Sequence, residues 1–133
     1  MAKKDIRTIP SSMFGDDVKL IVYNPYYDNR GYFFEPYNED WFFENIKSDV
    51  HFVQDNESKS GFGTLRGMHY QIDPFSQGKL IRVITGSVID FVLDIREGSP
   101  TFGKFEPYEL NGDDFKSLWI PRGVRSWIPV NER

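Results

Sequence analysis

Apolar and polar residues alternate along most of the chain, which is the pattern of half-buried β-strands. The clearest run is 88–95, where every odd-numbered position is apolar while the even-numbered positions include Asp90 and Asp94. Glycine and proline residues separate this run from other segments of similar pattern. Those further strands are expected at 18–23, 32–35, 51–54, 64–71, 105–110, 116–120 and 126–130.

Residues 79–84 precede the 88–95 run, with Thr85-Gly86-Ser87 between the two segments. This spacing predicts a hairpin with a tight glycine turn, in which Lys79 and Asp90 share one face. Both faces of the hairpin are largely apolar, so it is buried on both sides or lines a cavity on one side. In a cavity Lys79 and Asp90 would have to be paired, because burying a lone charge is costly. Alternatively, Lys79 starts its strand in water at the rim.

One helix is expected near residues 38–46. Asn38 is a good N-cap, acidic residues follow it in the first turn, and Trp41, Phe42 and Ile46 lie at helical spacing. Many short strands with regular turns and a single short helix indicate an all-β sandwich or barrel. The length of 133 residues fits one domain spanning residues 1–133.

Composition narrows the function classes. Aromatic residues make up 17% of the chain, which excludes a disordered protein. The net charge is -4 and there is no block of Lys or Arg, which argues against nucleic-acid and anionic membrane surfaces. No apolar stretch approaches the ~20 residues of a spanning helix, and no targeting segment is visible, so we expect a cytoplasmic protein. There is no cysteine, and no spacing around His51 and His69 recommends a metal site.

The segment 64–71 holds the densest group of chemically useful side chains. Arg66, His69 and Gln71 fall within six residues of an otherwise apolar strand. Histidine suits general-base chemistry because its pKa lies near neutrality. From the residues alone, an ordinary core or surface histidine is the competing interpretation.

Several ordered motifs carry a resemblance to a known family. They read DNRGYFFE (28–35), FVQDN (52–56), LRGMHYQ (65–71), KLIRV (79–83), GSVID (86–90), DIR (94–96), SPTFG (99–103) and IPRG (120–123). Over roughly residues 15–130 the chain strongly resembles the dTDP-4-dehydrorhamnose 3,5-epimerase family. The resemblance implies a cupin-type jelly roll, also called a double-stranded β-helix, that forms a homodimer. It also implies an isomerase of dTDP-rhamnose biosynthesis that acts without metal or organic cofactor on a dTDP-4-keto-6-deoxyhexose.

The resemblance also implies roles for individual residues. His69 is the base and Lys79 is the group near the C4 oxygen, since epimerisation beside a ketone needs a base and a group that holds the enolate oxygen. Asp90 and Ser126 are possible supporting residues. The implied substrate-binding residues are Arg30 and Arg66 for the diphosphate, Phe33 against the nucleotide base, and Glu35, Gln54 and Asn56 as polar contacts.

Three departures from the family pattern keep alternatives open. Ser126 stands where the family usually has histidine, and Glu57 stands where histidine is common. The family's later strands, with a tyrosine acid and a carboxylate that orients the base, would lie beyond Arg133. The chain is therefore interpreted as a truncated epimerase, as a shortened enzyme for single-carbon epimerisation or ketoisomerisation, or as a catalytically impaired nucleotide-sugar-binding cupin.

Overall fold

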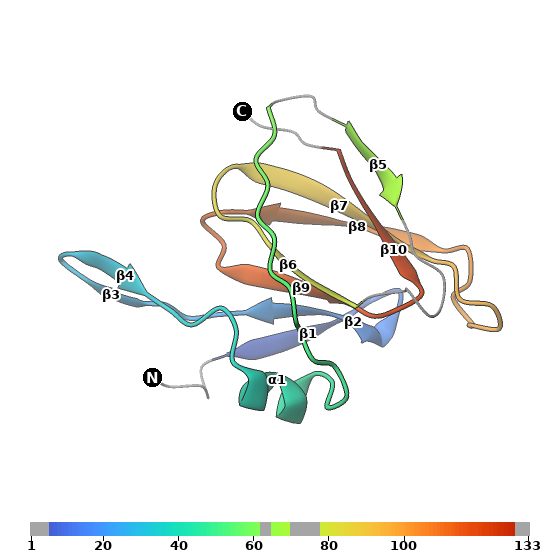
Figure 1. Cartoon of the computed structure of the whole chain (residues 1–133), viewed down its shortest axis with the longest axis horizontal. Coiled ribbons are helices and arrows are strands. Elements are labelled where there is room, and N and C mark those ends of the chain that lie inside the picture. Colours follow the sequence, from blue (N-terminus) through green and yellow to red (C-terminus); the bar gives the residue numbers. More distant parts are fainter. Residues whose placement is uncertain (1–5, 62–64, 70–77, 130–133) are drawn as a thin grey trace.

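Two antiparallel sheets pack face to face in the computed structural model, which describes residues 6–61, 65–69 and 78–129 (Figure 1). Of residues 65–69 and 129 only the backbone is described. The first sheet has the order β1 (Arg7–Ser11), β2 (Gly15–Val22), β9 (Lys116–Ile120) and β6 (Lys79–Arg82). The second has the order β5 (Leu65–His69), β10 (Val124–Pro129), β7 (Ser87–Asp94) and β8 (Phe105–Asn111).

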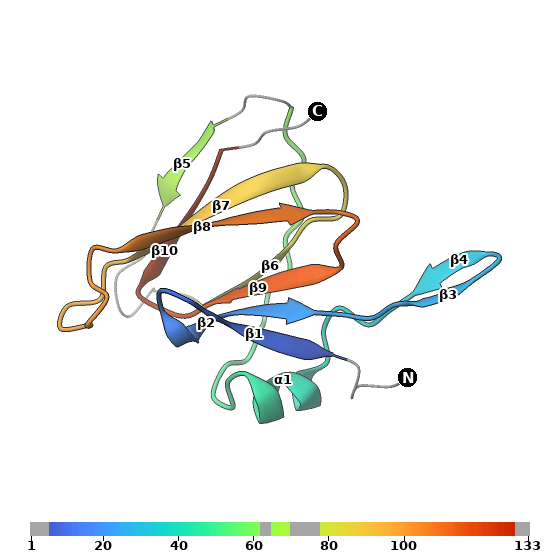
Figure 2. The same ribbon diagram turned by 180° about the vertical axis from the view of Figure 1, so that it is seen from behind.

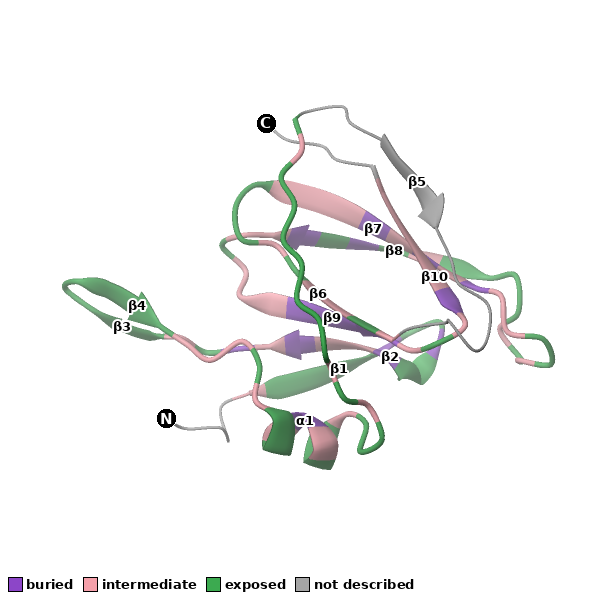
Figure 3. Cartoon of the chain, in the orientation of Figure 1, coloured by how far each residue is buried: buried purple, intermediate pink, exposed green. Residues whose placement is uncertain are grey.

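The core lies between the two sheets. Figure 3 shows buried segments, in purple, on strands of both sheets. The buried members of the core are Phe14, in the turn between β1 and β2, and, on the strands, Val18, Val92, Tyr108, Leu110, Leu118, Ile120 and Val124. The alternation in residues 88–95 is confirmed, because Asp90, Val92 and Asp94 are buried while the intervening positions are partly exposed. The even-numbered face of β7 therefore points into the sandwich.

The predicted 79–95 hairpin is wrong. β6 pairs with β9 in the first sheet, whereas β7 pairs with β8 and β10 in the second. The link 83–86 therefore crosses from one sheet to the other, with Gly86 at φ +84°. Ile81, Val83 and Val88 still pack against the common core, from opposite sides of it. This explains the apolar character of both faces, because one face of each strand lines the core and the other is partly covered.

Helix α1 (Glu39–Asn45) confirms the expected helix. The Asn38 side chain accepts a hydrogen bond from the backbone N–H of Trp41, as an N-cap should. Phe42 is the buried residue of the helix, and its ring meets Trp119 of β9 edge-on at 5.3 Å between centroids. Within the described residues no helix is long and apolar enough to cross a membrane.

The strand expected at 51–54 is wrong. Residues 51–61 run as an extended segment without strand pairing, from the side of α1 across one side of the sandwich (Figures 1 and 2). Phe52 is held there by the rings of Phe42 and Tyr37, at 5.3 and 5.5 Å, while Val53 is 94% exposed. The apolar-polar alternation at 51–54 therefore reflects one packed residue, Phe52, and not a strand.

A two-stranded hairpin, β3 (Tyr26–Asp28) with β4 (Gly31–Phe33), extends away from both sheets (Figure 1). One side of it carries a cluster of rings in which Phe34 and Tyr32 each meet Phe115 nearly edge-on, at 5.0 and 4.9 Å. Tyr27 joins the same cluster at 6.3 Å from Phe115. The hairpin is exposed along its length, so we call residues 26–33 the arm.

Candidate active site

Asp90 and Ser126 meet between the two sheets, and the charge of Lys79 acts on Asp90 from the rim. Lys79 begins β6 in the first sheet, Asp90 lies in the middle of β7, and Ser126 lies on the neighbouring strand β10. The positive charge of Lys79 acts on the Asp90 carboxylate, and the Ser126 hydroxyl donates a hydrogen bond to Asp90 Oδ1. Lys79 itself is exposed at the rim. This agrees with the interpretation of Lys79 as a solvated residue at the rim, and among the described residues it forms no ion pair with Asp90.

Asp90 is the unusual member of this group. It is 0% exposed, and its Oδ2 atom has no hydrogen-bond partner among the described residues. Burial raises the pKa of Asp90 to about 6, although the Ser126 hydroxyl, the Trp127 backbone N–H and the Lys79 charge each act to lower it. A buried carboxyl that exchanges its proton close to neutral pH is typical of a functional site.

The raised pKa makes stability depend on pH in a direction that Asp90→Asn should reveal. The carboxyl titrates near 3.8 in the unfolded chain and at about 6 in the folded one. Its contribution to folding is therefore greatest at low pH and declines as pH rises from about 4 to 6. Because asparagine does not titrate, Asp90→Asn should gain about 2 kcal/mol relative to wild type between pH 4 and pH 7. Urea unfolding at both pH values measures this; a difference between the proteins that does not change with pH would contradict it.

His69 ends β5, and the strand register places it directly opposite Ser126 of β10. Ser126 is also opposite Val92 of β7, two residues along from Asp90. Arg66 lies opposite Ile128 on the same pair of strands. The side chains of His69 and Arg66 lie outside the described residues, so for these two positions only the register is established.

Arg30 and Phe33 are not brought to this group. Both lie on the arm, which points away from the sheets (Figure 1). The Arg30 guanidinium donates to Asp28 Oδ2 from Nε at 3.1 Å and from Nη2 at 2.6 Å, while its side chain is 86% exposed. Phe33 is 66% exposed. Within one copy of the described chain, these two predicted substrate contacts stand apart from Lys79 and Asp90.

The other predicted contacts lie between the arm and the sandwich. Glu35 lines a small pocket beneath α1 together with Tyr23, Trp41, Phe42 and Leu80. Gln54 and Asn56 are exposed on the extended segment 51–61, where Gln54 Nε2 donates to Asn56 Oδ1 at 3.2 Å. In chain order, these residues lie between the arm and β5.

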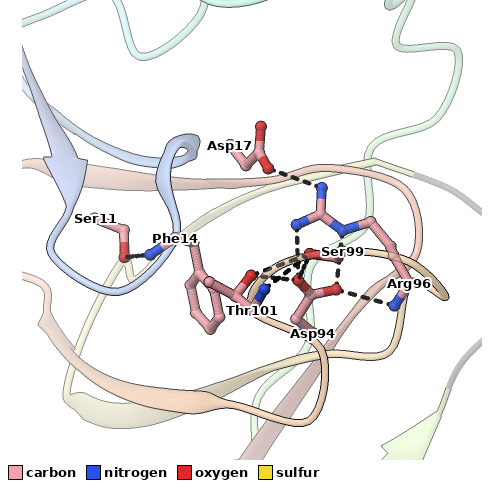
Figure 4. A network of polar contacts seen from close by, with 7 residues as sticks. All are labelled: Ser11, Phe14, Asp17, Asp94, Arg96, Ser99 and Thr101. Carbon is pink, nitrogen blue, oxygen red and sulfur yellow. Dashed lines mark hydrogen bonds and ion pairs between the residues drawn. The ribbon is translucent and has the colours of Figure 1, made fainter.

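A network of hydrogen bonds satisfies the Asp94 carboxylate, and the sequence pattern did not reveal it (Figure 4). Asp94 is 0% exposed and accepts hydrogen bonds from Arg96 Nε and Nη2, both at 2.9 Å, and from the Ser99 and Thr101 hydroxyls, both at 2.6 Å. Arg96 also reaches Asp17 of β2 at 2.9 Å. Only the close spacing of Asp94, Arg96, Ser99 and Thr101 could have hinted at it.

The two buried aspartates of β7 therefore differ in the pKa and the hydrogen bonding of their carboxyl groups. Burial alone would raise the pKa of Asp94, but its donors outweigh burial and hold that pKa well below the usual range. Asp94 is fully satisfied and ties the first sheet to the second. Asp90 has one oxygen without a partner in the part of the chain that the structure describes, and its pKa is raised. In the part of the chain that the structure describes, no three His, Asp or Glu side chains group closely enough to hold a metal ion.

Comparisons with known proteins agree on one family. A family model described as dTDP-4-dehydrorhamnose 3,5-epimerase matches residues 15–128. A protein of that name from Shigella flexneri is 46% identical over 106 residues, which are 78% of this chain and 59% of that protein. The crystal structure of dTDP-6-deoxy-D-glucose-3,5-epimerase from Legionella pneumophila, in complex with dTDP-4-keto-L-rhamnose, has a TM-score of 0.89 and 38% identity, over 96% of this chain and 66% of that one.

A more distant solved relative is the 3'-monoepimerase from Streptomyces bikiniensis, in complex with dTDP-quinovose. It has a TM-score of 0.82 and 27% identity, over 92% of this chain and 62% of that one.

These matches confirm the predicted cupin jelly roll, the fold of these solved relatives. The chain spans 59% of the Shigella flexneri relative and 55% of a second relative, from Sinorhizobium fredii. The match to the family model nevertheless runs through both sheets, from β2 to β10. The chain belongs to the dTDP-4-dehydrorhamnose 3,5-epimerase family.

Proposed function

We propose that this protein takes part in epimerisation of a dTDP-4-keto-6-deoxyhexose, by removing a proton from the carbon next to the C4 ketone. The observation that carries the proposal is the hydrogen bond from Ser126 to the buried Asp90, with Ser126 directly opposite His69 in the sheet. The charge of Lys79 acts on the same carboxyl. Family membership supports the choice of substrate class. The expected cellular location, the cytoplasm, stays a prediction.

In the proposed reaction His69 is the base. It accepts the proton bound to carbon, and the electron pair moves to the carbonyl oxygen to give an enolate. Lys79 lies at the rim of the sandwich, where its ammonium group can stabilise the negative oxygen. Return of a proton to the opposite face of the carbon completes the inversion. The family resemblance implies that a tyrosine donates this proton; for the alternative of a shortened enzyme, water is the donor.

The arm supports the expected homodimer. Arg30 and Phe33 stand away from Lys79 in one copy, and an exposed hairpin rich in aromatic residues is poorly stabilised alone. We therefore propose that the arm of one copy reaches the site of a second copy, where Arg30 binds the diphosphate and Phe33 packs on the nucleotide base.

Subunit mixing tests this arrangement. Arg30→Ala and His69→Ala should each be inactive, but an equal mixture that exchanges subunits should recover about a quarter of wild-type activity, because half the dimers hold one intact site. A mixture as inactive as its parts, with exchange of subunits verified, would contradict a shared site.

Deuterium incorporation tests the reaction itself. Wild-type protein with dTDP-4-keto-6-deoxyglucose in D2O should introduce deuterium at C3, C5 or both, faster than in a protein-free control, as followed by NMR. Incorporation at one carbon only would favour the single-carbon alternative, which the similarity to the Streptomyces bikiniensis 3'-monoepimerase supports. Tight binding without any incorporation would instead favour the alternative of a nucleotide-sugar-binding cupin.

A further inference from the structure

The free oxygen of Asp90 requires a physical explanation. A fully buried carboxyl with one oxygen unpaired among the described residues is costly, by roughly 1–3 kcal/mol for the missing hydrogen bond alone. Asp94, two residues further along the same strand, shows that this fold can satisfy a buried carboxylate completely. Among the described residues, the unpaired oxygen is therefore particular to Asp90 and does not reflect a general limit of the fold.

Ser126 connects Asp90 to the position of His69. Its hydroxyl donates to Asp90 Oδ1, which leaves the lone pairs of Oγ available to accept a hydrogen bond. On its other side Ser126 is directly opposite His69 in the antiparallel register. Residues directly opposite in such a pair have Cβ atoms about 4.5–5.5 Å apart on the same face of the sheet. The serine thus stands between the acid and the histidine.

We propose that Ser126 and Asp90 are positioning residues for His69, with Ser126 Oγ accepting a hydrogen bond from the imidazole N–H while its own hydroxyl donates to Asp90. This inference rests on the proposed function in one respect, that His69 is the base. The pair would fix the tautomer of His69 and place a carboxylate behind it.

The Ser126–Asp90 pair would balance a charge that forms during the reaction. When His69 takes the proton from carbon, its ring becomes a cation, and the electron pair left behind resides on the enolate oxygen. The Asp90 carboxylate stabilises that cation through Ser126, whose own proton stays on the serine oxygen. Proton transfer from carbon to nitrogen then occurs between two compensating charges, the Asp90 carboxylate behind the ring and Lys79 near the enolate.

Other charged groups near this position are few in the described elements. Lys79 faces it from β6, and Arg125 is the neighbour of Ser126 on β10. Arg66 lies on β5 itself. Asp94 lies on the same face of β7 as Asp90, but it is neutralised by Arg96. Asp90, on β7 beyond β10, is therefore a buried anion that no ion pair among the described residues neutralises.

Proton NMR titration of the histidine rings tests the proposal directly. The chain has only two histidines, so a His51→Asn variant assigns both ring signals. In Asp90→Asn the affinity of His69 for a proton should fall about tenfold, seen as a titration midpoint about one pH unit lower. Ser126→Ala should lower it in the same direction, whereas Ser126→Thr, which keeps the hydroxyl, should restore the wild-type midpoint.

A matched control comes from the other histidine. Glu39 Oε1 lies 3.2 Å from His51 Nδ1 on the exposed surface. Glu39→Gln should therefore alter the His51 signals and leave the His69 midpoint unchanged. If Asp90→Asn fails to fold, Ser126→Ala and Ser126→Thr carry the test. An unchanged His69 midpoint in folded Asp90→Asn or in Ser126→Ala would overturn the proposal.

The test of the positioning pair and the test of the proposed function can fail independently. A shifted His69 midpoint without deuterium incorporation by wild type would support the positioning pair and reject the epimerase reaction on that substrate. Incorporation by wild type with an unshifted midpoint in the variants would support the reaction and reject the pair. If both hold, Ser126→Ala should lower kcat for incorporation about tenfold while the KM stays near the wild-type value.

Discussion

Deuterium incorporation next to the ketone is expected to slow by about 10²–10⁴-fold when His69 is replaced with alanine, since that is the usual contribution of a positioned general base. The substrate should still bind, because the predicted diphosphate and nucleotide contacts lie on other residues. NMR measurement of incorporation at saturating substrate, together with a separate binding titration, distinguishes loss of the base from loss of affinity. The loss should be in kcat.

His51→Ala is the matched control for this experiment. His51 is exposed, contacts Glu39 and lies edge-on against Phe43 at 5.0 Å, on the surface beside α1. Its removal should leave incorporation at the wild-type rate. Equal losses in the two variants would contradict a specific role for His69. Incorporation by His69→Ala at the wild-type rate would exclude it as the base.

The largest loss of stability is expected from Asp94→Asn. The change removes the charge from a fully buried carboxylate that holds Arg96, Ser99 and Thr101, and it leaves the guanidinium without its main acceptor. We expect the free energy of unfolding to fall by about 3 kcal/mol, because breaking one partner of a buried ion pair is strongly destabilising. Urea unfolding at pH 7 measures the change.

Asp17→Asn and acid pH provide the controls. Asp17 contacts the same guanidinium but its side chain is 56% exposed, so its replacement should cost less than about 1 kcal/mol. The pKa of Asp94 is lowered on folding, so its contribution is present above the unfolded pKa of 3.8 and is lost as pH falls below it. The difference between wild type and Asp94→Asn should therefore shrink in acid. A difference that persists there would assign the loss to packing.

Strong local patterns in the sequence predicted the elements that depend on them. Residues 116–120 form β9 as expected, and α1 begins after the predicted cap Asn38. β1 and β3 were missed because their strands are exposed on nearly every residue, so no face is marked by apolar side chains. The link 83–86 was misread as a hairpin turn because a glycine turn looks the same whether it joins neighbours in one sheet or crosses between two.

The candidate site was predicted unevenly for a similar reason. Alternation predicted a common face for Lys79 and Asp90, but Asp90 is buried between the sheets while Lys79 lies exposed at the rim and acts on it by its charge. The hydrogen bond from Ser126 to Asp90 joins residues 36 positions apart, and no local pattern encodes it. The separation of Arg30 from Lys79 was also invisible, because the order of motifs along a chain does not specify how far apart they lie in the fold (Figure 1).

The strand order also has a consequence for how the protein folds. β9 lies between β2 and β6, and β10 lies between β5 and β7, so each sheet has a late segment of the chain at its centre. The pairing of Lys19 with Trp119 closes a loop of about a hundred residues, which carries a substantial entropic cost. Neither sheet can assemble on the ribosome until β9 and β10 have emerged. Refolding is therefore expected on the millisecond-to-second scale of proteins dominated by distant pairings.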